Sequence, residues 1–146
     1  MDFDSLVRAA IYGWFVEETR APGVADLARL LGEDPDAIRD AYGRLFRKRV
    51  LFLEPDGETI RMAPPFSAVA THHRVRVGDR EYFANCSWDS LGIPAALHER
   101  GEVFSRCEQT REPIHLRVGR EGPEPEAVVA HFAVPAAKWW ADLVYT

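Results

Sequence analysis

Apolar side chains recur at helical spacing in three stretches near the start of the chain. In the first stretch, residues 3–16, they fall three and four positions apart, which predicts an amphipathic helix. A second, shorter helix is expected over residues 24–31. The pair Asp34-Pro35 is typical of an N-cap and a first helical residue, so we expect a third helix with a buried face made of Ile38, Ala41, Tyr42, Leu45 and Phe46.

A pair of short strands is predicted directly after these helices. Residues 50–53 and 59–62 are strand-like, and the Glu54-Pro55-Asp56-Gly57 segment between them is a turn signal. Three helices followed by a hairpin is the order of winged-helix proteins, in which the third helix reads DNA. We therefore expect residues 1–62 to form a winged-helix-like domain.

The rest of the chain predicts short strands around one helix. Two prolines make residues 62–66 typical of an extended linker, so the second domain is placed at residues 63–146. Residues 74–83 predict a hairpin that turns at Gly78-Asp79. The other expected elements are a helix over 87–97 that Pro94 kinks or restarts, strands over 102–106, 114–118 and 127–134, a loop over 119–125, a short helix over 135–140 and a last strand over 143–145.

These elements predict an α+β fold, with a three-helix winged-helix-like domain ahead of a small mixed α/β core built on a β-sheet. The 146 residues suit one compact unit or two very small ones, and 47% hydrophobic residues suffice for a core. We find no run of about 18 apolar residues that could span a bilayer. The chain opens on the acidic segment Met1-Asp2-Phe3-Asp4, unlike a secretory signal, so a cytoplasmic location is expected.

Charge argues against nucleic acid as the main partner. The formal net charge is −5, and residues 1–62 hold 9 Lys plus Arg against 12 Asp plus Glu. The third helix does carry a cluster of cations, namely Arg39, Arg44, Arg47, Lys48 and Arg49. The overall balance favours a packing or dimerisation module over a DNA reader, and a homodimer is one outcome of that hypothesis.

Candidate chemistry lies where the predicted hairpin gives way to the predicted helix. Cys86 and Asp89 stand three residues apart, so a helix that starts near Cys86 brings the thiol and the carboxylate to one face. The positive end of the helix favours thiolate over thiol, which predicts a reactive sulfur beside a proton carrier. The alternatives are a buried, inert cysteine and an aspartate that only caps the helix.

The sequence contains few other metal-ligand candidates. Cys86 and Cys107 lie 21 residues apart and lack the Cys-x-x-Cys spacing of a structural zinc site, but two thiols are available to a soft metal. The adjacent His72 and His73 are expected to point to opposite faces of a strand, one buried and one exposed.

A set of residues on both sides of Cys86 forms a pattern that covers roughly residues 64 to 135. It consists of residues 65–67, residues 73–80, Tyr82, Ala84, Cys86, Asp89, Leu91, Pro94-Ala95, Val103, Ser105, Cys107, residues 110–113 and His131-Phe132. This pattern resembles the core of the alkylmercury lyases. The resemblance implies that carbon–mercury bonds are cut by protonolysis without a cofactor. On this resemblance Cys86 captures mercury, Asp89 relays the proton, and the partners are a small organomercurial and cellular thiols.

The chain departs from that family at one catalytic position. The lyases use a second cysteine on the strand before the histidine matched by His131, and the matching position here is Ala127. Cys107 matches a cysteine that plays a supporting part in the family. Either Cys107 replaces the missing ligand, or a cysteine beyond Thr146 in a longer chain does so, or the fold serves another task.

Three functions therefore remain open from the sequence. The first is an organomercurial lyase or a close relative. The second is a non-catalytic binder of a soft metal ion such as Hg(II) or Cu(I), with Cys86 as a ligand and Cys107, His131 or Asp89 as possible further ligands. The third is a winged-helix regulator whose second domain senses a ligand.

Overall fold

The computed structural model describes residues 1–142. Three helices come first: α1 (Phe3–Glu18), α2 (Val24–Leu31) and α3 (Pro35–Arg47). The Asp2 side chain caps α1 by accepting from the Ser5 N–H, and Asp34 caps α3 in the same way. These local signals explain why the helices start where the sequence predicts.

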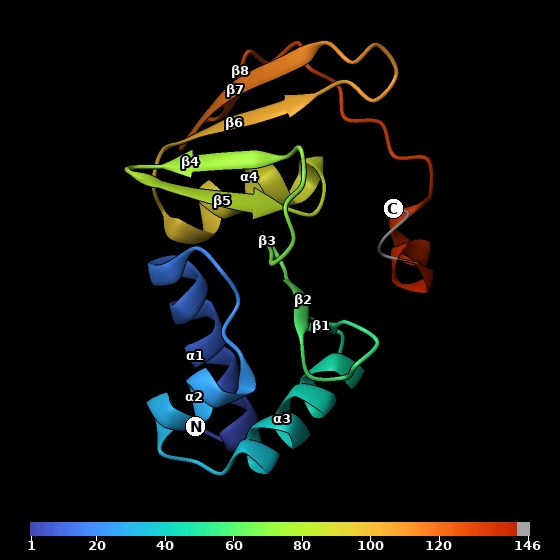
Figure 1. The fold of residues 1–146 in the computed structure, drawn as a ribbon. Coiled ribbons are helices and arrows are strands. Elements are labelled where there is room, and N and C mark those ends of the chain that lie inside the picture. The colour runs from blue at the N-terminus through green and yellow to red at the C-terminus, as the bar shows by residue number, and fades with distance from the viewer. Residues whose placement is uncertain (143–146) are drawn as a thin grey trace.

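Eight strands form one antiparallel sheet in the order β1-β2-β3-β5-β4-β6-β7-β8. Figure 1 shows the sheet rising from the helices at β1 to the opposite end of the molecule at β8. The strands are β1 (Phe52–Leu53), β2 (Ile60–Ala63), β3 (Phe66–Ser67), β4 (Arg74–Val77), β5 (Arg80–Ala84), β6 (Gly101–Arg106), β7 (Pro113–Gly119) and β8 (Gly122–Glu124). The structure is thus a mixed α+β fold, as predicted, and these strands form one large antiparallel sheet in place of the small core sheet that was expected.

One face of the sheet is buried under helix α4 (Ser87–Leu97). Strand register places Tyr82, Val75, Val103 and Leu116 side by side in neighbouring strands, and all four are buried. Side chains alternate along a strand, so this row defines the core face, while Arg74, Arg76 and Phe104 lie on the other face. Helix α4 follows β5 directly, which positions its first residues at the end of that strand.

The helices and the sheet share one hydrophobic core. Phe66 of β3 stacks on Phe15 of α1 with ring centroids 5.4 Å apart, and it contacts the ring of Tyr82 from the other side. The Tyr82 hydroxyl donates to the Val16 carbonyl of α1 at 3.0 Å. Residues 62–66, expected as a linker, instead form the end of β2, a turn at Pro64-Pro65 and the start of β3. The domain boundary between residues 62 and 63 remains a prediction. The residues before it and after it pack directly against each other in these contacts.

Several local predictions were wrong. Phe46 is 46% exposed, although its spacing placed it on the buried face of α3. Helix α4 continues through Pro94, so it does not start afresh there, and the expected loop at 119–125 contains β8. Residues 127–134 form no strand, and the short helix after them is the 3-10 helix η1 (Ala136–Ala141). The strand expected at 143–145 lies outside the described residues.

Candidate functional site

Cys86 occupies the junction between β5 and α4. It is the N-cap residue of α4, with extended backbone angles of φ −143° and ψ 179°, and its carbonyl accepts the Ser90 N–H at 3.0 Å. The strand that ends at Ala84 therefore delivers the thiol to the first turn of the helix. This placement agrees with the prediction from the sequence.

The thiol of Cys86 meets the carboxylate of Asp89 across that turn. The Sγ atom donates to Oδ2 at 3.5 Å, a normal length for a hydrogen bond that involves sulfur. Cys86 is partly buried, whereas the neighbouring Trp88 is 63% exposed. A thiol and a carboxylate thus share one partly desolvated position.

Burial sets the protonation state of this pair. Desolvation and, next to it, the negative charge of Asp89 raise the pKa of Cys86 to about 11, although the Asp89 and Trp88 N–H groups act to lower it. Desolvation also raises the pKa of Asp89, against the lowering effect of its hydrogen bonds with Cys86. The prediction that the helix terminus favours a resting thiolate was therefore wrong, because burial outweighs the helix dipole.

Alkylation with iodoacetamide should reveal this protonation state. Only the thiolate reacts, so the rate at Cys86 should still rise steeply between about pH 8 and pH 10. Cys107 should level off earlier, because hydrogen bonds from the Thr110 side chain and from the Thr110 and Gln109 N–H groups lower its pKa. Peptide mass spectrometry separates the two sites, and identical pH profiles would contradict the assignment.

The surroundings of the pair include a residue that the sequence did not single out. Tyr12 of α1 donates its hydroxyl proton to the Pro64 carbonyl at 2.8 Å. Burial raises the pKa of Tyr12, Arg8 lowers it, and the charge of Asp89 makes a smaller raising contribution, so Tyr12 and Asp89 interact electrostatically. No sequence signal pointed to Tyr12, because its partner lies far along the chain and it falls off the main apolar stripe of α1.

Cys107 lies just beyond β6, on the far side of β4 from Cys86. Strands β5 and β6 both pair with β4, and neighbouring strands are about 4.8 Å apart, so the backbones of β5 and β6 stand about 10 Å apart. Both cysteines are free thiols. Within residues 1–142 no group of three or more His, Cys, Asp or Glu side chains is arranged to hold a metal ion.

The two histidines do not point to opposite faces. The rings of His72 and His73 lie 4.1 Å apart, and the two residues precede β4. The Nδ1 atom of His73 is 2.8 Å from the Ser105 hydroxyl, and burial lowers the pKa of His73 to about 4, so this ring is neutral. Ala127 and His131 lie in the segment without strand structure that leads to η1.

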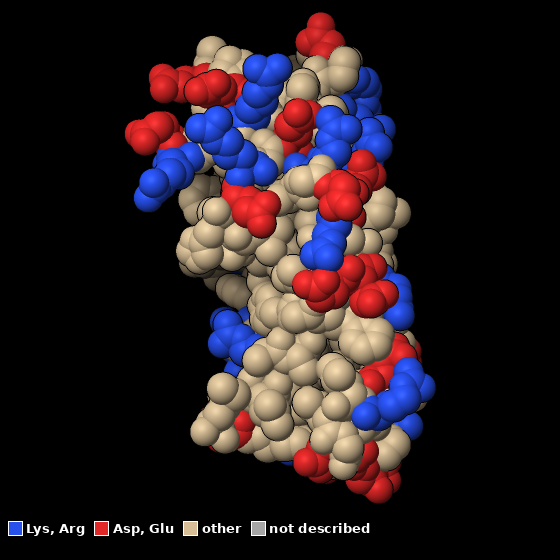
Figure 2. All heavy atoms as spheres, turned by 90° about the vertical axis from the view of Figure 1, so that its left-hand side faces the viewer, with Lys and Arg blue, Asp and Glu red and all other residues tan. Residues whose placement is uncertain are grey.

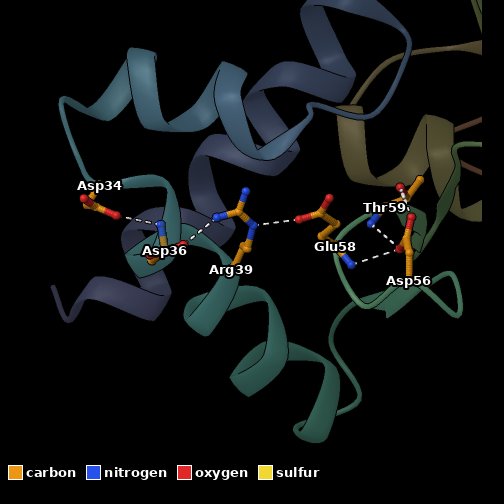
Figure 3. A network of polar contacts seen from close by, with 6 residues as sticks. All are labelled: Asp34, Asp36, Arg39, Asp56, Glu58 and Thr59. Carbon is orange, nitrogen blue, oxygen red and sulfur yellow. Dashed lines mark hydrogen bonds and ion pairs between the residues drawn. The ribbon is translucent and has the colours of Figure 1, made fainter.

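Several cations of the cluster on and just after α3 form ion pairs with carboxylates of the protein itself. Figure 3 shows Arg39 between Asp36 of its own helix and Glu58 of the β1–β2 turn, where its Nε lies 2.6 Å from the Glu58 carboxylate. Arg44 and Lys48 both pair with Asp4 of α1, at 2.8 and 2.9 Å. Carboxylates of the protein thus offset part of the positive charge that a phosphate would meet at Arg39, Arg44 and Lys48.

The surface charges are mixed on the face that Figure 2 presents. Lys and Arg side chains alternate with Asp and Glu over the sheet end of the molecule, and much of the helical end carries neither charge. A nucleic-acid interface usually shows one continuous basic patch, which this face lacks. No helix among residues 1–142 is long and apolar enough to cross a membrane.

Comparison with known structures identifies a protein of similar fold. The chain is similar to the protein in the crystal structure of the mercury-bound form of MerB2, with a TM-score of 0.66 and 22% sequence identity. The match covers 84% of this chain and 59% of that one, so this chain spans somewhat more than half the length of that relative. A comparison with curated protein sequences gave no match.

The sequence profile that matches this chain is that of the alkylmercury lyases. It covers residues 66–146, which is more than half of the chain and includes β3 to η1. The Cys86–Asp89 pair at the start of α4 lies within the matched region. On the profile match, this chain belongs to the alkylmercury lyase family.

Proposed function

We propose that this protein cleaves carbon–mercury bonds by protonolysis, with Cys86 as the mercury ligand and Asp89 as the proton relay. The observation that carries the proposal is the hydrogen bond from Cys86 Sγ to Asp89 Oδ2 in a partly buried position. Thiolate sulfur is the preferred protein ligand of a soft metal, and an aspartate within hydrogen-bond reach can accept and return one proton.

The proton balance follows from the pKa directions. The resting Cys86 is a thiol, and its sulfur loses the proton to the Asp89 carboxylate as it bonds to the mercury of an organomercurial cation. The raised pKa of Asp89 suits a group that must hold that proton for a short time. Asp89 then protonates the carbon, the carbon–mercury bond breaks with its electron pair on carbon, and the hydrocarbon leaves Hg(II) on the sulfur of Cys86.

A second sulfur would assist this step, because a second thiolate weakens the bond from mercury to carbon. We propose that a free cellular thiol supplies it, since β4 separates the strands that lead to Cys86 and Cys107. Free thiols then remove Hg(II) and restore the Cys86 thiol. This scheme needs no cofactor.

The first 62 residues fit the same proposal as a winged-helix-like packing module. The order α1, α2, α3 and the β1–β2 hairpin supports that description, and the ion pairs of Arg39, Arg44 and Lys48 favour packing over DNA binding. A homodimer and a cytoplasmic location stay predictions. The alternative function, a soft-metal binder, draws its support from the lowered pKa of Cys107.

The experiment is single-turnover release of benzene from phenylmercury in the presence of free thiol. We expect release by the wild type above the thiol-only control, and Cys107→Ser should keep at least about half of that rate because mercury is captured at Cys86. A complete loss in Cys107→Ser would show instead that Cys107 is the second ligand. No release by the wild type, together with stoichiometric mercury binding, would favour the metal binder.

A further inference from the structure

We propose that Tyr12 of α1 is a positioning residue for the Cys86–Asp89 pair and acts through the turn between β2 and β3. This inference rests on the proposed function. It gives the helical part of the chain a direct role in the chemistry of the sheet part. Two packing contacts connect α1 to α4.

The first contact is made by the Tyr12 hydroxyl. It donates to the Pro64 carbonyl at 2.8 Å, and the Tyr12 ring stands edge-on to Phe66 with centroids 6.3 Å apart. The hydroxyl and the ring thus hold both ends of the β2–β3 turn. Because the Pro64 carbonyl is partly buried, loss of this donor would leave it without its partner.

The second contact joins the same turn to α4. A Cβ atom added at Gly92 would lie 3.3 Å from the Pro65 Cβ, so the helix backbone packs closely against the proline ring. Gly92 is one turn of helix after Asp89. A shift of the β2–β3 turn would therefore displace α4 close to Cys86 and Asp89.

We expect the first turns of α4 to move as one rigid unit when the β2–β3 turn shifts. The Ser90 hydroxyl donates to the Ser87 carbonyl at 2.6 Å, and the side chain of Ile93, also in α4, is completely buried. Cys86 is tied to this unit through its carbonyl and through its thiol. Movement of the helix thus changes how deeply both Cys86 and Asp89 are buried.

The electrostatic setting agrees with a positioning role. Burial raises the pKa of Tyr12 against the lowering effect of the Arg8 charge and hydrogen bond, so the phenol remains neutral and keeps its donor proton at physiological pH. The Arg8 guanidinium lies 5.7 Å from the centre of the Tyr12 ring. Tyr12 therefore adds no negative charge beside the carboxylate that must relay a proton.

The test is Tyr12→Phe, with Tyr82→Phe as the matched control. Each variant removes one tyrosine hydroxyl that donates to a backbone carbonyl, and both rings pack on Phe66, but the Tyr82 bond goes to Val16 at the end of α1. We expect Tyr12→Phe to lower kcat for benzene release about tenfold with little change in KM, since small displacements of reacting groups are costly. Tyr82→Phe should lower the urea midpoint similarly but leave kcat within about twofold.

A second readout does not depend on turnover. Tyr12→Phe should speed the alkylation of Cys86 at pH 8 by at least about threefold, because a loosened α4 admits water and lowers the thiol pKa. Gly92→Ala, which presses on Pro65 from the other side, should also lower kcat. Equal kcat and equal alkylation rates in Tyr12→Phe and Tyr82→Phe would overturn the proposal. Absence of benzene release in the wild type would refute the proposed function, while the alkylation rates would still decide the role of Tyr12.

Discussion

Replacing Asp89 with asparagine should lower kcat for benzene release by at least about 100-fold, the usual contribution of a positioned proton donor. The amide has nearly the same shape but cannot accept the Cys86 proton and return it to carbon. Mercury binding at Cys86 should persist, because the sulfur ligand is intact. Rapid-quench measurement of benzene and equilibrium measurement of bound mercury check the two parts separately.

The same variant should make Cys86 more reactive toward iodoacetamide. The charge of Asp89 raises the pKa of the thiol, so its removal lowers that pKa and increases the thiolate fraction at pH 8. Turnover and alkylation therefore change in opposite directions. Because unfolding would also expose Cys86 and speed its alkylation, an unchanged circular dichroism spectrum and urea midpoint must accompany the two rates. Asp79→Asn, in the exposed β4–β5 turn, is the control and should alter neither rate. Slower alkylation of Cys86 in Asp89→Asn would contradict the electrostatic account of the pair.

Replacing Cys86 with serine should abolish both turnover and tight mercury binding. A hydroxyl oxygen is a hard ligand of similar size, and it binds a soft metal ion far more weakly than sulfur does. Benzene release should fall to the thiol-only control. The measurement is single-turnover release together with the mercury content after gel filtration, and circular dichroism should show an unchanged fold.

Cys107→Ser serves as the comparison for this second variant. It removes a thiol of lower pKa from the turn that follows β6, yet it leaves the sulfur beside Asp89 in place. Retained mercury in Cys86→Ser and lost mercury in Cys107→Ser would reverse the assignment of the primary ligand. The pair of variants thus decides which cysteine captures the metal.

Local sequence signals predicted the position of the site well. The Asp34-Pro35 cap, the turn at Gly78-Asp79 and the start of α4 at Cys86 all depend on residues close in sequence, and the structure confirms each of them. The Cys86–Asp89 contact followed from helical spacing alone. Such features are set by backbone geometry and by caps, which act within a few residues.

Three of the features that the sequence did not predict depend on distant parts of the chain. The β-prone residues 127–134 form no strand, because the neighbouring position beside β7 is taken by β8, and a strand needs a partner. The pKa of Cys86 depends on burial that spacing does not report. Tyr12 escaped notice for the same reason, since its hydroxyl partner Pro64 lies 52 residues away.

The contact between Phe52 and Trp140 has a consequence for the order of folding. The two rings stack with centroids 5.0 Å apart, and Arg49 lies against the outer ring. This contact closes a loop of about 90 residues, so its entropy cost is among the highest in the chain and it forms after the sheet. Until the C-terminal segment arrives, Phe46 and Phe52 remain an open aromatic patch at the first strand of the sheet. A nascent chain whose residue 140 is still inside the ribosome therefore exposes an aromatic surface through which it can associate with other chains.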